Sequence, residues 1–349
     1  MENPTPVPPP IPAAAPAPGP NSGSPSATLP AGLARVSELR ALLGRELARA
    51  VHGMEREVDG TFAAILARGH VLLEGPPGVA KTLFARALAT ALGLQFSRIQ
   101  FTPDLMPADV TGTSVFHPTE GAFHFQPGPI FAQLVLCDEI NRAPAKTQSA
   151  LLEAMQEGAA TEGGTRRPLP QPFIVIATMN PIEHEGTYRL PEAQLDRFLV
   201  QLSVGYPTAD VECELLEQAH ARSPLANPAE LGVRAVTGAE ELASLAESVA
   251  GSVRVDHAVA TYVVRLLCAT RQSPALRLGA SPRAGLSLLR LAKSMAALAG
   301  RDFVTPDDVK RAFLPTLGHR VLLEPVEEVE GTDARMVLER ILETTEVVR

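Results

Sequence analysis

One stretch of eight residues has the composition and spacing of a loop that binds nucleotide phosphates. It reads Gly75, Pro76, Pro77, Gly78, Val79, Ala80, Lys81 and Thr82. An apolar run precedes it and a segment with helical spacing follows it, which predicts a strand–turn–helix unit. In such a unit, successive backbone N–H groups and the helix N-terminus face phosphate oxygens. Lys81 would then reach the β- and γ-phosphates of a nucleoside triphosphate, and the Thr82 hydroxyl would bind Mg²⁺.

Ala80 departs from the usual pattern, which has glycine at this position. Because alanine disfavours positive φ, we expect a right-handed backbone conformation at Ala80. The alternative interpretation is a glycine-rich turn that joins a strand to a helix and binds nothing. The adjacent Lys81 and Thr82 favour the phosphate-binding interpretation.

Two acids, Asp138 and Glu139, follow the apolar run 133–137. At the carboxyl end of a parallel strand they would emerge where ligands bind in α/β sheets. Asp138 is the candidate for holding Mg²⁺, and Glu139 is the candidate for polarising the attacking water. Two acids are common at any strand end, so this interpretation depends on the phosphate loop upstream.

The apolar run 173–177 ends in Thr178, Met179, Asn180 and Pro181. The Asn180 amide could lie between the attacking water and the γ-phosphate, whereas Pro181 would end the strand. The alternative is an asparagine that only forms a turn.

These residues need a sheet to position them, and the sequence predicts one. The predicted strands span 71–74, 95–101, 133–137, 173–177 and 198–204. Strands that alternate with helices indicate a parallel sheet covered on both faces. From residue 208 onward strand signals vanish, and the predicted helices lie near 210–220, 238–250, 256–270, 283–299 and 306–314. Ser281 and Thr305, each followed by proline, predict the starts of two of these helices.

The resulting domain prediction has three parts. Residues 1–30 hold 11 of the 32 prolines and predict a disordered Pro/Ala-rich tail. Residues 33–207 predict an α/β nucleotide-binding domain, and 208–349 predict an all-helical domain.

The composition excludes some classes of protein. A net charge of −8 argues against a duplex-binding protein, which usually displays a basic surface. No apolar run is long enough to span a membrane, and no leader resembles a signal peptide, so we expect a cytoplasmic protein.

The chain resembles AAA+ ATPases, and among them the MoxR family. The resemblance covers about residues 35–325 and lies in four motifs, at 75–82, 138–143, 177–181 and 190–198. It implies an α/β P-loop core with a five-stranded parallel sheet in the order 5-1-4-3-2, followed by a helical lid. It also implies an ATP hydrolase with ATP and Mg²⁺ as ligands.

The resemblance assigns roles to three further residues. Asn180 matches the sensor-1 residue, and Arg197 matches an arginine finger that acts from a neighbouring subunit. The alternative for Arg197 is a structural salt bridge with Asp196 or Glu192. Arg283 matches the sensor-2 arginine of the lid, which would contact the γ-phosphate. Arg142 is a further candidate for an inter-subunit site.

The alternating residues on either side of 119–121 predict a β-hairpin, and the resemblance implies that it projects toward the pore of a ring. A second candidate insertion lies at 161–168, and either could contact a client. The histidines 117, 124 and 184 show no spacing typical of a metal site.

The resemblance further implies a homo-oligomeric ring, with six subunits expected, that matures or activates a client complex, often with a von Willebrand factor A domain protein as partner. One alternative is a nucleic-acid motor or loader, which salt-sensitive stimulation by DNA or RNA would reveal; the acidic charge balance makes nucleic acid an unexpected partner. A second is a scaffold that binds ATP without hydrolysing it.

Overall fold

The computed structural model describes residues 29–180, 188, 190–219 and 227–348. Most of the predicted tail, Pro181 and His184 lie outside the described residues.

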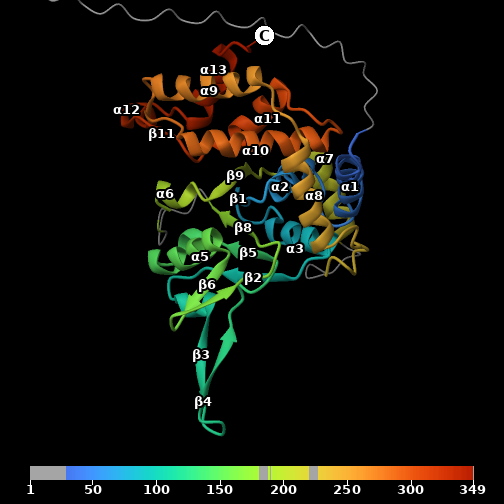
Figure 1. Cartoon of the computed structure of the whole chain (residues 1–349), viewed down its shortest axis with the longest axis vertical. Helices are drawn as coiled ribbons and strands as arrows, with labels where there is room; N and C mark the ends of the chain where they lie inside the picture. Colours follow the sequence, from blue (N-terminus) through green and yellow to red (C-terminus); the bar gives the residue numbers. More distant parts are fainter. Residues whose placement is uncertain (1–28, 181–187, 189, 220–226, 349) are drawn as a thin grey trace, which may run out of the picture.

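The centre of the molecule is a five-stranded parallel sheet (Figure 1). Its strands are β1 (His70–Glu74), β2 (Phe96–Gln100), β5 (Leu134–Asp138), β8 (Ile174–Met179) and β9 (Phe198–Ser203). They lie in the order β2-β5-β8-β1-β9, which confirms the expected sheet and its 5-1-4-3-2 strand order.

Alternate residues of the strands pack into two separate layers, because successive side chains of a strand point to opposite faces. Leu134 and Leu136 of β5 pack with the helices α1, α2 and α3, whereas Val135 and Cys137 pack with α4 and α5. The sheet is therefore covered on both faces, as its apolar strands require. The helices of this part, and a 3-10 turn among its described residues, are α1 (Ala31–Leu47), α2 (Glu55–Leu66), α3 (Lys81–Ala91), α4 (Pro107–Thr111), η1 (Ile140–Arg142), α5 (Ala145–Glu157), α6 (Glu192–Leu195) and α7 (Ala209–Ala219).

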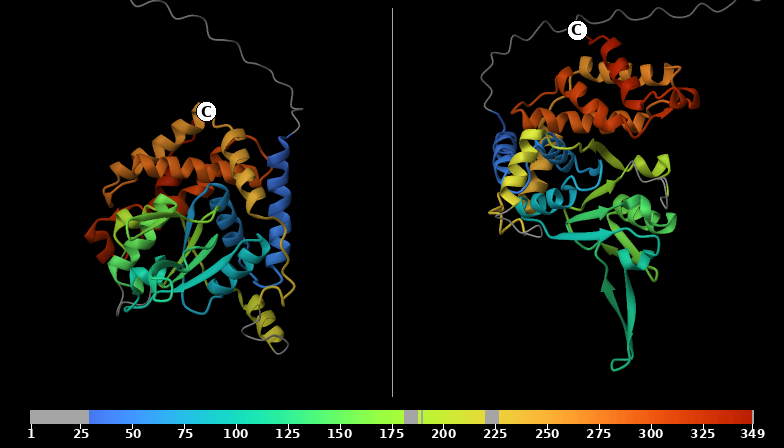
Figure 2. Two further views of the ribbon diagram at one scale, coloured as in Figure 1. Left: turned by 60° about the horizontal axis from the view of Figure 1, so that its bottom comes forward. Right: turned by 180° about the vertical axis from the view of Figure 1, so that it is seen from behind.

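Two antiparallel hairpins interrupt this α/β pattern. The predicted hairpin is formed by β3 (Gly112–His117) and β4 (Ala122–Pro127), and it projects from the body on the side away from the C-terminal helices (Figures 1 and 2). The segment around 161–168 forms a shorter one, β6 (Ala159–Glu162) and β7 (Thr165–Pro168).

The C-terminal part consists mainly of helices, as predicted. They are α8 (Ala239–Ser252), α9 (His257–Gln272), α10 (Pro282–Leu298), α11 (Pro306–Leu317), α12 (Pro325–Val329) and α13 (Ala334–Thr344). The Ser281 and Thr305 side chains cap α10 and α11, which confirms both predicted helix starts. Two short strands, β10 (Leu276–Leu278) and β11 (Leu322–Leu323), also pair here. The prediction of no strand after residue 208 was wrong for these, since two or three residues are too few to show an alternating pattern.

The C-terminal helices share a hydrophobic core with the first part of the chain. Val36 of α1, Phe62 of α2, Leu288 of α10 and Phe313 of α11 are fully buried in one continuous cluster. The helices therefore pack on the α1–α2 side of the sheet as one body with it (Figure 2). None of the helices in the described part of the chain is long and apolar enough to cross a membrane.

Candidate active site

The segment 75–82 forms the loop that the sequence predicts, between the carboxyl end of β1 and the start of α3. Its two glycines serve different needs. A Cβ on Gly75 would lie 2.2 Å from the Val204 carbonyl oxygen, so only glycine allows this close approach. Gly78 has φ +84°, which glycine adopts without strain, and no atom of the described residues lies within 4 Å of the place of its absent Cβ. The loop therefore has the open, glycine-dependent shape of a phosphate cradle.

The expected right-handed conformation of Ala80 was wrong. Ala80 has φ 58° and ψ 19°, in the left-handed region, and it is the N-cap of α3. The loop turns sharply into the helix here, and the geometry that glycine usually supplies is imposed on alanine at a cost of about 1–2 kcal/mol. Such strain is typical of functional loops that the surrounding fold holds in place.

The two polar side chains that end the loop are held on its inner side. The Lys81 ammonium donates hydrogen bonds to the carbonyl oxygens of Gly75 and Pro76, the latter at 3.1 Å. The Thr82 hydroxyl donates to Asp138 Oδ2 at 3.1 Å. The sheet thus brings Thr82 and Asp138, 56 residues apart in the chain, into direct contact.

Asp138 ends β5 and is only 8% exposed. Thr178 at the end of the neighbouring strand β8 donates to its Oδ1 at 2.6 Å. Its Oδ2 accepts from Thr82 and from the Arg98 guanidinium, with Nη2 at 2.7 Å. Both carboxylate oxygens are therefore held in fixed directions.

Glu139 has φ 56°, which is unusual for a residue other than glycine. Its backbone N–H donates to the Thr178 hydroxyl at 2.9 Å, which helps to hold this conformation. Its carboxylate Oε2 accepts from Gln100 Nε2 and from Arg142 Nη1, each at 3.0 Å. Backbone strain at the candidate water activator agrees with a functional position.

Asn180 follows β8, the strand that lies between β1 and β5 in the sheet. It is 6% exposed, and the residue before it, Met179, accepts a hydrogen bond from the Gly75 N–H at 3.2 Å. Asn180 therefore lies at the same sheet edge as the loop and the acid pair, as the sensor-1 role requires.

Three residues at this edge were missed by the sequence interpretation. Thr178 holds both acids, although only Asn180 of its motif was given a role. Arg98 and Gln100 lie two residues apart on β2, so they share one face of the strand beside β5. Two long polar side chains at alternate positions of a predicted strand were the signal that could have found them.

The oxygen donors present fit a magnesium ion. The Thr82 hydroxyl and the Asp138 carboxylate meet at 3.1 Å beside an open loop, and hard oxygen ligands next to a phosphate site are what Mg²⁺ prefers. Thr82 and Asp138 are thus the residues that would hold it, as the sequence predicts.

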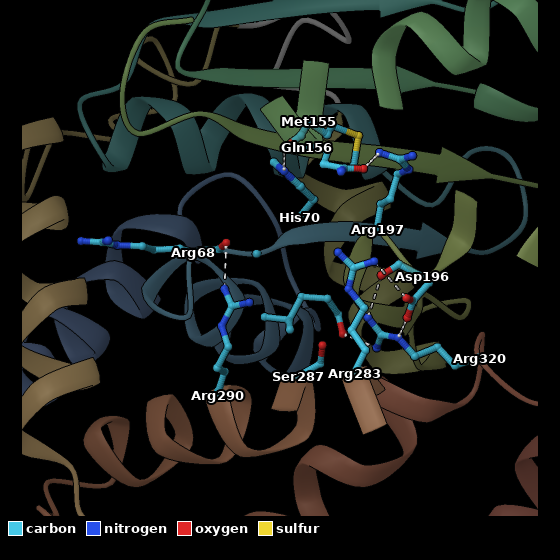
Figure 3. A pocket seen from close by; sticks show the side chains of 12 residues that line it. Arg68, His70, Met155, Gln156, Asp196, Arg197, Arg283, Ser287, Arg290 and Arg320 are labelled. Atoms are coloured by element: carbon cyan, nitrogen blue, oxygen red, sulfur yellow. Dashed lines mark hydrogen bonds and ion pairs between the residues drawn. The ribbon is translucent and has the colours of Figure 1, made fainter. Parts of the chain in front are cut away.

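Arg197 and Arg283 line one pocket of about 190 Å³ (Figure 3). His70 and Gly69, at the amino end of β1, line the same pocket. Arg197 Nη1 donates to the Leu152 carbonyl oxygen at 2.8 Å, so its side chain runs along α5. The structure brings the two predicted arginines together, but at the opposite end of β1 from the phosphate loop.

Asp196 is engaged by other arginines than Arg197. It forms an ion pair with Arg320, at 2.7 Å between Oδ1 and Nε, and its Oδ2 lies 3.6 Å from Arg283 Nη1 (Figure 3). The Arg197 guanidinium is not paired with Asp196; its Nη1 donates instead to the Leu152 carbonyl oxygen and to Gln156 Oε1 on α5 (Figure 3).

Comparisons with known proteins give a consistent picture. A model of the ATPase family associated with various cellular activities (AAA) matches residues 70–200, and a model of the AAA lid domain matches residues 268–341. The first match includes the phosphate loop, the acid pair and Arg197, and the second includes Arg283.

Two curated relatives match nearly the whole chain. The uncharacterized protein YeaC of Bacillus subtilis is 43% identical over 90% of this chain and 98% of its own length. The chaperone MoxR1 of Mycobacterium tuberculosis is 43% identical over 86% of this chain and 80% of its own. A crystal structure from Cytophaga hutchinsonii, of a protein described as a candidate ATPase, is 35% identical with a TM-score of 0.83, over 91% of this chain and 97% of that one.

Proposed function

The chain belongs to the MoxR family of AAA+ ATPases, and from this premise we propose that it hydrolyses ATP with Mg²⁺ in a homo-oligomeric ring and uses the energy to remodel a partner protein. Six subunits are the expected number. The cytoplasmic location that the sequence predicts stays a prediction.

The proposal rests mainly on one observation: within one chain, the phosphate loop and the arginines Arg197 and Arg283 lie far apart. The phosphate loop follows the carboxyl end of β1, whereas Arg197 and Arg283 lie at its amino end. A five-residue strand spans about 13 Å, which is too far for either guanidinium to reach a nucleotide in its own loop. This supports a site shared by two subunits, in which one supplies the loop and its neighbour supplies both arginines.

The residues around the phosphate loop have separate roles in the proposed reaction. Backbone N–H groups of 78–82 and the Lys81 side chain bind the phosphates, and Glu139 accepts the proton of the attacking water. Asn180 orients that water against the γ-phosphate. Mg²⁺, when bound, neutralises charge on the phosphate oxygens. The neighbour's Arg197 and Arg283 stabilise charge that develops on the γ-phosphoryl group.

The β3–β4 hairpin is the better candidate for contact with a client. Phe116 and Phe123 face each other across it with ring centroids 5.2 Å apart, and they are 49% and 71% exposed. Exposed aromatic side chains on a projecting element are typical of protein-binding sites.

The β6–β7 hairpin instead supports the base of β3–β4. Glu162 of β6 accepts a hydrogen bond from the Ser114 hydroxyl of β3 at 2.7 Å, and the Arg167 guanidinium lies 3.8 Å from the Phe125 ring. A von Willebrand factor A domain protein is the expected accessory partner, an expectation that comes from the family alone.

Mixing two inactive variants tests the shared site. We expect Arg197→Ala to bind ATP without turnover and Lys81→Ala to lose binding, each measured by calorimetry and phosphate release. Mixed rings contain interfaces that pair the intact loop of the first variant with the intact arginines of the second, so turnover should return. Native mass spectrometry shows whether the subunits mix. Mixed rings without any regained turnover would refute the shared site.

A further inference from the structure

We propose that Arg98 is a built-in counter-ion that competes with Mg²⁺ for Asp138, and that it thereby lowers the affinity of the site for the metal. The proposal rests on the proposed function, since it concerns the same magnesium and ATP site. It adds a residue that sets how much Mg²⁺ the nucleotide needs for binding.

Arg98 contacts the carboxylate oxygen of Asp138 that would bind Mg²⁺. Asp138 Oδ2 accepts from Arg98 Nη2 at 2.7 Å and from Arg98 Nε at 3.2 Å. The same oxygen accepts from the Thr82 hydroxyl at 3.1 Å, so it is the oxygen that faces the phosphate loop. The other oxygen, Oδ1, is taken by Thr178. A cation bound between Thr82 and Asp138 must therefore meet the charge of Arg98.

Burial explains why a counter-ion is needed before the metal arrives. The Asp138 side chain is 12% exposed, and a buried carboxylate without a cation is costly. Arg98 offsets that cost in the protein without nucleotide. Once Mg²⁺ is bound, the carboxylate no longer needs the arginine, and two cations at one oxygen repel each other.

Arg98 is also free to leave. Its side chain is 44% exposed, and it extends from β2, an edge strand of the sheet. Gln100 Oε1 accepts from Arg98 Nη2 at 2.7 Å, which offers the guanidinium a second partner. The arginine can therefore swing toward solvent at a small cost when the metal displaces it.

The first test measures the Mg²⁺ dependence of binding in the full-length protein, with a fluorescent ATP analogue as the probe. We expect Arg98→Gln to lower the Mg²⁺ concentration for half-maximal binding by about three- to tenfold. Arg98→Lys keeps the charge but loses the contact through two nitrogens, so its Mg²⁺ requirement should lie between those of Arg98→Gln and the wild type. The matched control is Arg254→Gln, which breaks an exposed arginine–aspartate pair of 3.1 Å in the lid and should change nothing.

A second measurement separates this role from a merely structural one. Without nucleotide, Arg98→Gln should lower the melting temperature, because Asp138 loses its counter-ion. With Mg²⁺ and a non-hydrolysable ATP analogue, the difference from wild type should shrink. An unchanged or higher Mg²⁺ requirement in Arg98→Gln would overturn the proposal.

Should Arg98→Gln not fold, the wild-type protein still tests the proposal. Its crystal structure with Mg²⁺ and the analogue should show the Arg98–Asp138 pair opened beyond 4 Å, and an intact pair would refute the competition. Absence of any nucleotide binding by the wild type would defeat the proposed function itself. Normal binding with an unshifted Mg²⁺ requirement would defeat only the role of Arg98.

Discussion

Arg320 of the C-terminal helical part binds Asp196, the residue before Arg197, with 2.7 Å between Nε and Oδ1. The Arg320 side chain is 3% exposed. It also donates to backbone carbonyl oxygens at both ends of the contact, those of Asp196, Phe198, Leu199 and Thr316. One buried guanidinium therefore joins the lid to the start of β9, directly beside the candidate arginine finger.

Replacing Arg320 should destabilise the protein strongly. Arg320→Met removes the charge but keeps much of the apolar stem, and it leaves Asp196 and several buried carbonyl oxygens without their donor. The expected loss is about 3–5 kcal/mol, seen as a lower urea midpoint or melting temperature. Arg335→Met, which breaks an exposed pair with Glu339, is the control and should cost less than about 1 kcal/mol. Equal effects of the two variants would contradict the role of Arg320.

Glu139→Gln should separate binding from hydrolysis. The amide keeps the size of the side chain but cannot accept the proton of water, so turnover should fall by about 10²–10⁴-fold. ATP affinity and assembly of the proposed ring should be unchanged, as measured by calorimetry and light scattering. Glu153→Gln on α5 is a matched control that keeps full turnover. Wild-type turnover in Glu139→Gln would show that another residue activates the water.

Ala80→Gly should stabilise the protein, against the usual effect of this substitution. Glycine relieves about 1–2 kcal/mol of left-handed strain at Ala80 and gives back about 0.4–1 kcal/mol through the greater freedom of the unfolded chain. The expected net gain is about 0.5–1 kcal/mol in urea unfolding. The same change at Ala34, inside α1 and exposed, should instead cost about 1 kcal/mol. A loss at both positions would contradict the strain at Ala80.

Lowering the pH should destabilise the folded protein at pH values well above those at which carboxylates titrate. Burial, with the charge of Arg320 beside it, lowers the pKa of His319 to about 3, from the usual value of 6.5. Between these two values the unfolded chain binds a proton that the folded chain does not, so stability falls as the pH falls. His319 alone should account for about 2 kcal/mol of loss between pH 7 and pH 5.

Urea unfolding of His319→Gln checks this. The variant should lose about 2 kcal/mol less than the wild type over the same pH interval, whatever its stability at pH 7. His257→Gln, on an exposed first turn of α9, is the control. An unchanged pH dependence in His319→Gln would exclude the histidine as its source.

The sequence was sufficient for the sheet and for one half of the site. The phosphate loop, the acid pair and Asn180 each follow a short apolar strand, and parallel strands necessarily bring such ends together. The loop conformation at Ala80 was predicted wrongly, because the general preference of alanine says nothing about the turn that the fold imposes there.

The pocket of Arg197 and Arg283, and the contacts of Arg98 and Gln100 beside the phosphate loop, were harder to predict because they depend on residues distant in the sequence. Asp196 and Arg320 are 124 residues apart, and nothing local in the chain indicates that they pair. In the sequence, Arg98 and Gln100 look like ordinary polar residues of a strand. Their role becomes visible only when the fold places them beside Asp138 and Glu139. Long-range pairing of charged side chains leaves no periodic signal in a single sequence.

The hydrophobic cluster that joins α1 and α2 to α10 and α11 has a practical consequence for expression. The two segments that the family models match, 70–200 and 268–341, look like separable modules on a sequence map. A cut between them would leave a broad apolar surface on each fragment, with leucine and phenylalanine side chains open to water. Neither fragment is expected to fold or stay dispersed without the other, so truncation is a poor way to study this lid.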